Sequence, residues 1–313
     1  MCTAISYSSG DHYFGRNLDY FHLFGEEIVI TPRSFPLVFR KTTAIKKHYA
    51  IIGTAHVEIN FPLYYDAVNE KGLCMAGLLF SEYAHYHSIK PRYDNIAPFE
   101  FIPWILSVCS NVKEAKELLQ SISIADIPFS DTLGVSPLHW IISDKEHSIT
   151  VESVKNGLFV YDNKAHVLTN APEFPSHLFN LNNYIGLSPY APKNTFSENL
   201  PLKNYSFGMG AIGLPGDFSS MSRFVKASFV LSNSVKKSNE NDCVNHFFRI
   251  LDTVAMPEGA IRNESGNCEK TLYSCCINAD KGIYYYTTYS DRTIKSVSID
   301  TDDFKDTLIC TPL

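Results

Sequence analysis

The sequence contains little that would direct it to a membrane, a nucleic acid or a metal ion. It has no run of about eighteen apolar residues, and its first residues lack the charged start and apolar run of a secretion signal. The net charge is −6 with a pI near 6.0 and no basic block, which argues against a nucleic-acid partner. The eight cysteines form no C-x-x-C pair and no zinc-spaced group with histidine. We therefore expect a cytoplasmic protein that has reduced thiols, binds no metal or cofactor and does not span a membrane.

Internal repeats, low-complexity segments and interdomain linkers are absent as well. The 313 residues are 45% hydrophobic and 19% charged, a composition typical of a globular protein with a substantial core. We therefore predict a single domain over residues 1–313, from which Met1 is removed.

The hydrophobic patterns predict many strands and a few grouped helices. Helical spacing of apolar residues marks 99–119, 220–234 and 241–254. Residues 171–218 are expected to be rich in loops, and a G-x-G-x-x-G at 208–213 follows no strand and so predicts no dinucleotide site. Strands are expected at 27–31, 49–54, 73–80, 138–143, 148–153, 158–161, 166–169, 271–277, 282–289 and 293–299. This order favours an antiparallel α+β fold with helices packed on sheets, and 166–169 is expected to continue the meander before it.

The opening nineteen residues combine a possible nucleophile with charged partners in a predicted β-hairpin. If Met1 is removed, Cys2 carries a thiol and an α-amine, whose ordinary pKa values are about 8.5 and about 7.7–8.0. The amine can act as the general base for its own thiol. Arg16 can lower the thiol pKa, and Asp19 can accept a hydrogen bond from the amine. Taken alone, a cysteine at position 2 is weak support for catalysis, and 15–19 would equally suit a turn that leads into a strand.

Several motifs spread along the chain strengthen the catalytic interpretation. They read MCTAI at 1–5, FGRNLD at 14–19, NEKGLCMAGL at 69–78, PFEFIPWIL at 98–106, PLHWIISD at 137–144, VLTNAP at 167–172, GLPGDFSSMSRFVKA at 213–227 and KGIYYYTTY at 281–289. In this combination and order the chain resembles the choloylglycine hydrolase family, which includes bile salt hydrolases and penicillin V acylases. The resemblance implies an N-terminal-nucleophile hydrolase fold with four layers, α-β-β-α, and a homotetramer.

The resemblance also assigns roles to residues. Cys2 matches the nucleophile, and Arg16 and Asp19 match the pair that positions its thiol and amine. Asn170 matches a side chain that stabilises the oxyanion, and Arg223 matches a second catalytic arginine. From local sequence alone, Asn170 would be a turn residue and Arg223 a surface helix residue.

Leu79 departs from the family pattern. Bile salt hydrolases of the family usually carry asparagine after Ala-Gly-Leu, and penicillin V acylases often carry tyrosine. The resemblance implies that this position supplies a backbone N–H to the oxyanion hole, which leucine retains. We therefore expect a working hole with an altered rate or substrate preference.

The substrate pocket implied by the resemblance is apolar and aromatic. It would be built from loops at 20–25, 57–65 and 129–135, whose composition suits a steroid or aryl group, although each side chain could equally be a loop anchor. Tyr65 is bulkier than the small residue expected there, which predicts a narrower pocket. The residues expected to contact substrate are Leu18, Tyr20, Phe21, Phe24, Phe61, Tyr65, Phe129 and Leu133.

The leading functional hypothesis is hydrolysis of the amide bond in glycine- or taurine-conjugated bile salts through an acyl thioester on Cys2. The same intermediate could transfer its acyl group to an amine. One alternative is a penicillin V acylase or another N-acyl amidase on the same fold. A second is a catalytically weak homologue that binds steroids. A metal-dependent hydrolase is disfavoured because the eleven histidines do not cluster, and His85 and His87 are expected to be solvated.

Overall fold

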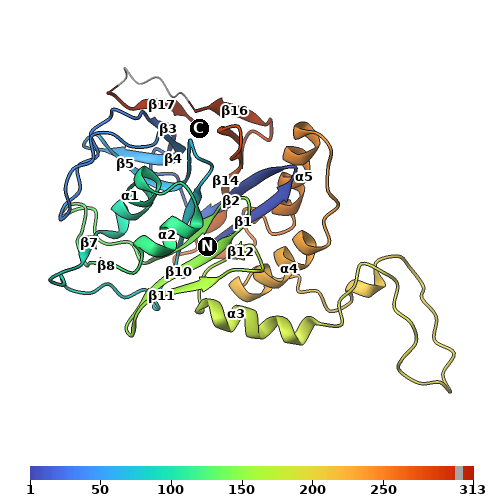
Figure 1. Cartoon of the computed structure of the whole chain (residues 1–313). Coiled ribbons are helices and arrows are strands. Elements are labelled where there is room, and N and C mark those ends of the chain that lie inside the picture. Colours follow the sequence, from blue (N-terminus) through green and yellow to red (C-terminus); the bar gives the residue numbers. More distant parts are fainter. Residues whose placement is uncertain (300–305) are drawn as a thin grey trace.

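Two large antiparallel sheets form the centre of the molecule (Figure 1). The structure is a computed structural model and describes residues 1–299 and 306–313. Among these residues the first sheet has seven strands in the order β12-β1-β2-β14-β15-β16, with β13 beside β14. Their bounds are β1 Cys2–Ser9, β2 Asp11–Tyr20, β12 Val167–Leu168, β13 Ile261–Arg262, β14 Cys268–Asn278, β15 Ile283–Thr288 and β16 Lys295–Ser298.

The second sheet has eight described strands in the order β11-β10-β9-β6-β5-β4-β3-β17. Its bounds are β3 Glu27–Thr31, β4 Ile51–Glu58, β5 Phe61–Asn69, β6 Cys74–Leu79, β9 Leu138–Ser143, β10 Ser148–Val154, β11 Gly157–Asp162 and β17 Ile309–Pro312. A short parallel pair joins β7 (Asp94–Ile96) to β8 (Ile122–Ile124). The sequence patterns did not predict β7, β8, β13 or β17, which span at most four residues each.

Helices cover the outer faces of both sheets (Figure 1). The first sheet is covered by α4 and α5, which contact β1, β2, β12 and β14, while α1 packs on β4, β5 and β6 of the second. The predicted antiparallel α+β fold with α-β-β-α layers is confirmed. The helices are α1 Phe101–Val108, α2 Val112–Leu118, α3 Phe174–Asn180, α4 Ser220–Ser232 and α5 Glu240–Asp252, with 3-10 turns η1 Pro98–Glu100, η2 Leu181–Tyr184 and η3 Met209–Ala211.

Two hydrophobic clusters hold the layers together. One joins the facing sides of the sheets and continues under α4 and α5, with Phe14, Ile141 and Phe247 fully buried. The other fills the space between the second sheet and α1, around Phe101 and Trp140. The opening hairpin takes part in the first cluster, so the predicted site starts from a strand in the core.

The expected single helix at 99–119 is wrong, because the chain breaks it into two. The backbone of Cys109 is extended and ends α1. Asn111 then accepts a hydrogen bond from the N–H of Glu114, while the Glu114 carboxylate accepts the N–H of Ser110 at 2.6 Å. These reciprocal bonds form a capping arrangement, which starts α2 as a new helix.

The expected loop at 57–65 is also wrong. The segment is the end of β4, a tight turn and the start of β5. Ile59 and Asn60 both have positive φ, of 49° and 58°, as a two-residue hairpin turn requires. Such turns normally contain glycine, so the pair Ile-Asn gave no turn signal.

The segment after β11 was predicted incorrectly in one respect. Residues 166–169 do not continue the meander, because β12 pairs with β1 in the other sheet, with Ala4 opposite Leu168. Residues 171–218 are rich in loops, as expected, and also contain α3 and two 3-10 turns. Between α3 and α4 the chain extends from the body as an arm, defined here as residues 185–215 (Figure 1).

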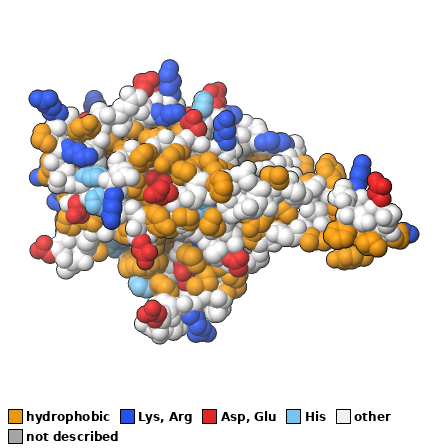
Figure 2. All heavy atoms as spheres, turned by 90° about the horizontal axis from the view of Figure 1, so that it is seen from below, with side chains coloured by type: hydrophobic (Ala, Val, Ile, Leu, Met, Phe, Trp, Pro, Cys, Tyr) orange, Lys and Arg blue, Asp and Glu red, His pale blue; other side chains and the backbone are white. Residues whose placement is uncertain are grey.

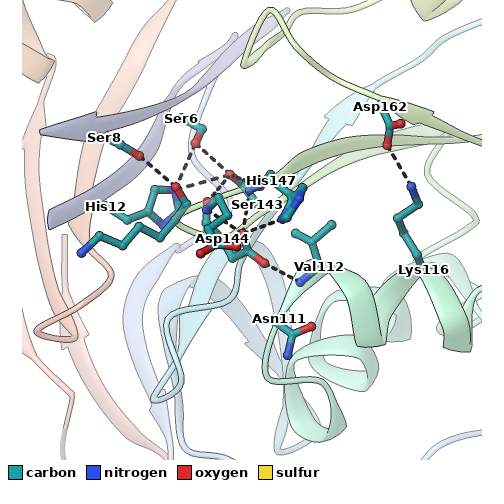
Figure 3. A network of polar contacts seen from close by, with 12 residues as sticks. Ser6, Ser8, His12, Asn111, Val112, Lys116, Ser143, Asp144, His147 and Asp162 are labelled. Carbon is teal, nitrogen blue, oxygen red and sulfur yellow. Dashed lines mark hydrogen bonds and ion pairs between the residues drawn. The ribbon is translucent and has the colours of Figure 1, made fainter.

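The turn end of the β1–β2 hairpin is anchored to the second sheet by a buried polar network (Figure 3). The Ser6 hydroxyl lies 3.0 Å from Nε2 of His12 and 2.8 Å from the hydroxyl of Ser143 at the end of β9. The next residue, Asp144, accepts the N–H of Val112 at the start of α2 at 2.7 Å. Burial lowers the pKa of His12 to about 4, so the ring is neutral at ordinary pH.

Candidate active site

Cys2 is the first residue of β1 and opens into a cavity of 540 Å³ between the sheets. It pairs with Leu18 across the hairpin and is 2% exposed. Ten of the residues predicted to act in catalysis or to contact substrate line this cavity. They are Cys2, Arg16, Leu18, Asp19, Tyr20, Phe24, Tyr65, Leu79, Phe129 and Leu133.

Two predicted substrate contacts lie elsewhere. Phe61 does not line the cavity but packs behind its wall, with ring centroids 5.7 Å from Phe99 and 6.3 Å from Phe129. Phe21 packs edge-on against the ring of Tyr20 at 5.3 Å and does not line the cavity either. Both therefore pack against lining residues, and their contact with substrate stays a prediction.

Arg16 joins the two sheets beneath Cys2. It is 1% exposed, and its Nη1 donates to the carbonyl of Gly77 at 2.6 Å and to that of Tyr65 at 3.1 Å. Burial alone would lower the pKa of Arg16, but Cys2, Tyr273 and Asp66 outweigh it and raise the value. The result is a fixed positive charge close to the thiol.

Asp19 lies beside the chain start with half of its hydrogen-bonding capacity unused. One oxygen accepts the hydroxyl of Thr271 at 2.5 Å, whereas Oδ2 is buried and has no partner among the described residues. Burial raises the pKa of Asp19, an effect that Arg223, the chain amine and Arg16 oppose. The free oxygen is therefore available to a donor near the start of β1.

Met1 extends the hairpin by one residue pair. Its amine donates to the carbonyl of Asp19 at 2.8 Å and forms an ion pair with Glu269. Burial lowers the pKa of this amine. Sequence analysis missed Glu269 and Thr271, which lie far along the chain on β14 and belong to no recognisable motif.

Asn170 orients the chain start from the end of β12. Its Oδ1 accepts the backbone N–H of Cys2 at 2.8 Å and Nη2 of Arg223 at 2.7 Å. Its Nδ2 donates to the carbonyl of Leu79 at 2.8 Å. Because two donors contact its oxygen and an acceptor contacts its nitrogen, the orientation of the Asn170 amide is determined. One Nδ2–H therefore remains for another acceptor, since an amide carries two.

Arg223 approaches Cys2 from α4. It is 1% exposed and donates to the carbonyl of Cys2 and, at 2.6 Å, to the hydroxyl of Thr3. Its Nε donates to the carbonyl of Phe218 at 2.9 Å. Burial lowers the pKa of Arg223, while Asp19 and Cys2 oppose that shift.

The backbone of Leu79 faces the site. The N–H of the next residue, Phe80, donates to Pro137 on the β9 side. Because donors and acceptors alternate along an antiparallel strand, the N–H and C=O of Leu79 point to the opposite edge. The pairing of β5 with β6 ends at Asp66 and Ala76, so this edge is open where Leu79 lines the cavity.

The assembled groups suit attack by a thiol on a carbonyl carbon. The sulfur of Cys2, the Arg16 guanidinium, the partly unpaired carboxylate of Asp19 and the backbone of Leu79 meet at one end of an apolar cavity. Asn170 and Arg223 do not line the cavity but contact Cys2 from behind it. Within residues 1–299 and 306–313, no His, Cys, Asp and Glu side chains are grouped to hold a metal ion. Nor does this part of the chain contain a helix long and apolar enough to cross a membrane.

Comparison with known proteins gives consistent matches. Residues 2–311 match the family described as linear amide C-N hydrolases, choloylglycine hydrolase family. The chain is 52% identical to a bile salt hydrolase/transferase of Lactiplantibacillus plantarum, covering 100% of this chain and 97% of the relative. It is 36% identical to a bile salt hydrolase/transferase of Clostridium perfringens, covering 97% and 94%.

Solved structures agree. The C2A mutant of the conjugated bile acid hydrolase from Clostridium perfringens superposes with a TM-score of 0.91 at 35% identity, covering 100% of this chain and 97% of that one. A penicillin V acylase from Agrobacterium tumefaciens superposes with a TM-score of 0.76 at 19% identity, covering 96% and 87%. At that identity the second match supports the shared fold alone.

Proposed function

Because this chain belongs to the choloylglycine hydrolase family of linear amide C–N hydrolases, we propose that it hydrolyses glycine- or taurine-conjugated bile salts. The observation that carries the proposal is the position of Cys2, at the meeting point of Arg16, Asp19 and Asn170 and at the end of an apolar cavity. The names of the relatives supply the substrate class. The cavity, lined largely by aromatic and aliphatic side chains, suits a rigid apolar acyl group.

Activation would begin with removal of Met1, which turns the backbone nitrogen of Cys2 into an α-amine. That amine would keep its contact with Asn170 and gain the unpaired Oδ2 of Asp19 as acceptor. Since the amine and the sulfur belong to the same residue, the amine can take the thiol proton. The charges of Arg16 and Arg223 favour the resulting thiolate.

The thiolate would attack the amide carbonyl and form a tetrahedral oxyanion. The backbone N–H of Leu79 and the remaining N–H of Asn170 would donate to that oxygen, and such a donor is worth about 2.7–4 kcal/mol in other enzymes. The α-ammonium returns its proton to the departing nitrogen, which leaves as glycine or taurine. Water then hydrolyses the thioester, and an amine in place of water would give acyl transfer.

An assay with three substrates tests this scheme. We expect wild-type protein to cleave taurocholate or glycocholate with a burst, and intact mass to show loss of Met1 and an acyl adduct. Cys2→Ala should abolish turnover and adduct without loss of secondary structure, whereas Cys310→Ala, which removes an exposed thiol, should keep both. Turnover by Cys2→Ala would refute the mechanism.

The two alternatives correspond to distinct outcomes of the same assay. Cleavage of penicillin V without cleavage of either bile salt would favour an acylase, as Leu79 in place of asparagine or tyrosine would allow. Retention of Met1 with no turnover would favour a steroid-binding homologue.

We also propose that the chain assembles as a homotetramer through the arm. The arm carries exposed aromatic residues, and hydrophobic side chains gather along it in Figure 2. Such a surface normally lies against a partner, and a second copy of the chain is the simplest one. Light scattering should show a tetramer that Phe207→Asp dissociates and Lys203→Asp does not. A monomeric wild-type protein would contradict the assembly.

Two further expectations remain proposals. We place the activity in the cytoplasm of a bacterium, which the eight free thiols and the bacterial relatives support. We also propose that residues 1–313, less Met1, act as a single domain.

A further inference from the structure

Glu26 places a buried carboxylate in the wall of the cavity, just before β3. It is 4% exposed and lines the same cavity as Cys2. Its Oε2 accepts the backbone N–H of Phe24 at 2.6 Å, which fixes the orientation of the group. Its Oε1 is buried and has no hydrogen-bond partner among the described residues. None of the catalytic steps above uses this side chain.

Two neighbours make this part of the wall polar. Burial and the charge of Glu26 raise the pKa of Tyr65, and the approach of its phenol O–H to the Glu26 carboxylate raises it further. The phenol therefore stays protonated and is a side-chain donor close to that carboxylate, which a ligand hydroxyl would join. His56 also lines the cavity, and its Nδ1 is buried without a partner among the described residues. Its Nε2 lies 3.3 Å from the Glu58 carboxylate. Much of the remaining wall is apolar, with Leu63, Phe99 and Ile127 as examples.

The chemistry of the group limits what it can bind. An ionised carboxylate only accepts hydrogen bonds, and leaving a buried acceptor unpaired is unfavourable. A ligand that brings an O–H to Oε1 satisfies it, whereas a purely hydrocarbon ligand buries it unpaired and an anionic group is repelled. The favoured ligand therefore has a rigid apolar body that carries a hydroxyl.

We propose that Glu26 recognises a hydroxyl group on the acyl part of the substrate and so determines which acyl groups are cleaved. This inference rests on the proposed hydrolysis of conjugated bile salts and adds to it a preference for hydroxylated acyl groups. A hydrogen bond to a charged group corresponds to a factor of about ten to a hundred in affinity. The effect should fall mainly on KM, because Glu26 contacts a part of the substrate remote from the scissile bond.

The test uses taurine conjugates of cholic, lithocholic and unsubstituted cholanic acid, which share the amine and differ in ring hydroxyls. Wild-type kcat/KM should favour at least one hydroxylated conjugate over the cholanic one about ten- to hundredfold. Glu26→Leu should raise KM for that conjugate by the same factor and leave the cholanic conjugate unchanged or improved. Glu26→Gln, which retains an acceptor for the Phe24 N–H, should give an intermediate loss.

A neighbouring glutamate supplies the matched control. Glu27 is the first residue of β3 and does not line the cavity. Glu27→Leu should therefore keep the wild-type order of the three substrates.

The outcomes separate the two proposals. Turnover of all three conjugates with no preference, or an equal loss on all three in Glu26→Leu and Glu26→Gln, would overturn the role of Glu26 and leave the hydrolase intact. Absence of turnover with every conjugate in wild-type protein would overturn the proposed function and this inference with it.

Discussion

Replacing Asn170 by alanine should reduce both catalysis and stability, because the proposed mechanism uses its free Nδ2–H for the oxyanion while its other contacts hold the fold. On the catalytic side, loss of one oxyanion donor raises the barrier by about 2.7–4 kcal/mol, which lowers kcat about 100- to 1,000-fold. On the structural side, the contact with Arg223 involves a charge and is worth about 1.5–3 kcal/mol. The contact with the Leu79 carbonyl adds about 1 kcal/mol.

Two further variants separate these effects. Asn170→Asp keeps an oxygen for Cys2 and Arg223 but removes the amide donor. Its kcat should therefore fall as far as in Asn170→Ala, while its free energy of unfolding falls less. Asn163 is 1% exposed and donates to Thr150 and to the carbonyl of Val167, away from Cys2. Asn163→Ala should lower stability by about 1–2 kcal/mol and leave kcat unchanged.

The assay combines pre-steady-state hydrolysis of a conjugated bile salt with urea unfolding of the same preparations. The expected order of stability is wild type, then Asn170→Asp, then Asn170→Ala. Both variants of Asn170 should show a slow acylation phase. If Asn170→Ala keeps kcat within about threefold of wild type while losing stability as Asn163→Ala does, the amide is purely structural and the reasoning fails.

Two other perturbations address the fold around the site. Burial raises the pKa of Asp66, and the charge of Arg16 opposes that rise. Arg16→Leu removes this cation and the donor to Gly77, so urea unfolding should show a loss of about 3–5 kcal/mol; a loss below about 1 kcal/mol would contradict the structural role. His12 has its pKa lowered by burial from 6.5 to about 4. The unfolded chain therefore binds the proton more readily, and stability present above pH 6.5 should fall by up to about 3 kcal/mol as the pH drops to about 4. In His12→Gln the unfolding free energy should change less over that range, and an unchanged slope would assign the pH dependence to other groups.

Local sequence patterns predicted the strands whose hydrophobic run and flanking turn residues both lie in the same short segment. The strands at 27–31 and 138–143 have the predicted bounds, because apolar residues flanked by turns are sufficient to mark them. The hairpin turn at Ile59 and Asn60 was not predicted, because it contains no glycine. The positive φ values of these two residues depend on the pairing of β4 with β5. The pairing of 166–169 with β1 in the other sheet depends on tertiary packing, which the local hydrophobic pattern cannot predict.

The site was predictable to the extent that its residues lie in motifs. The structure brings Cys2, Arg16, Asp19, Asn170 and Arg223 together, although Asn170 and Arg223 would have been assigned to a turn and a surface helix without the resemblance. Glu26 and Glu269 were missed because each is an ordinary acidic residue in sequence. Both draw attention only through burial, Glu269 against the amine of Met1 at the other end of the chain and Glu26 in the wall of the cavity.

The network around Cys2 has a consequence for how this chain could change over evolutionary time. Arg16, Asn170 and Arg223 bind backbone groups of several elements, so losing any of them would endanger folding before it affected chemistry. The sulfur of Cys2, in contrast, makes no hydrogen bond to the described residues and can be replaced with little effect on folding. A lineage released from selection for hydrolysis would therefore lose its second residue first and keep the others. Among descendants of this protein, conservation of the two arginines and the asparagine would indicate only that the fold is retained. Conservation of the cysteine would indicate that hydrolysis is retained as well.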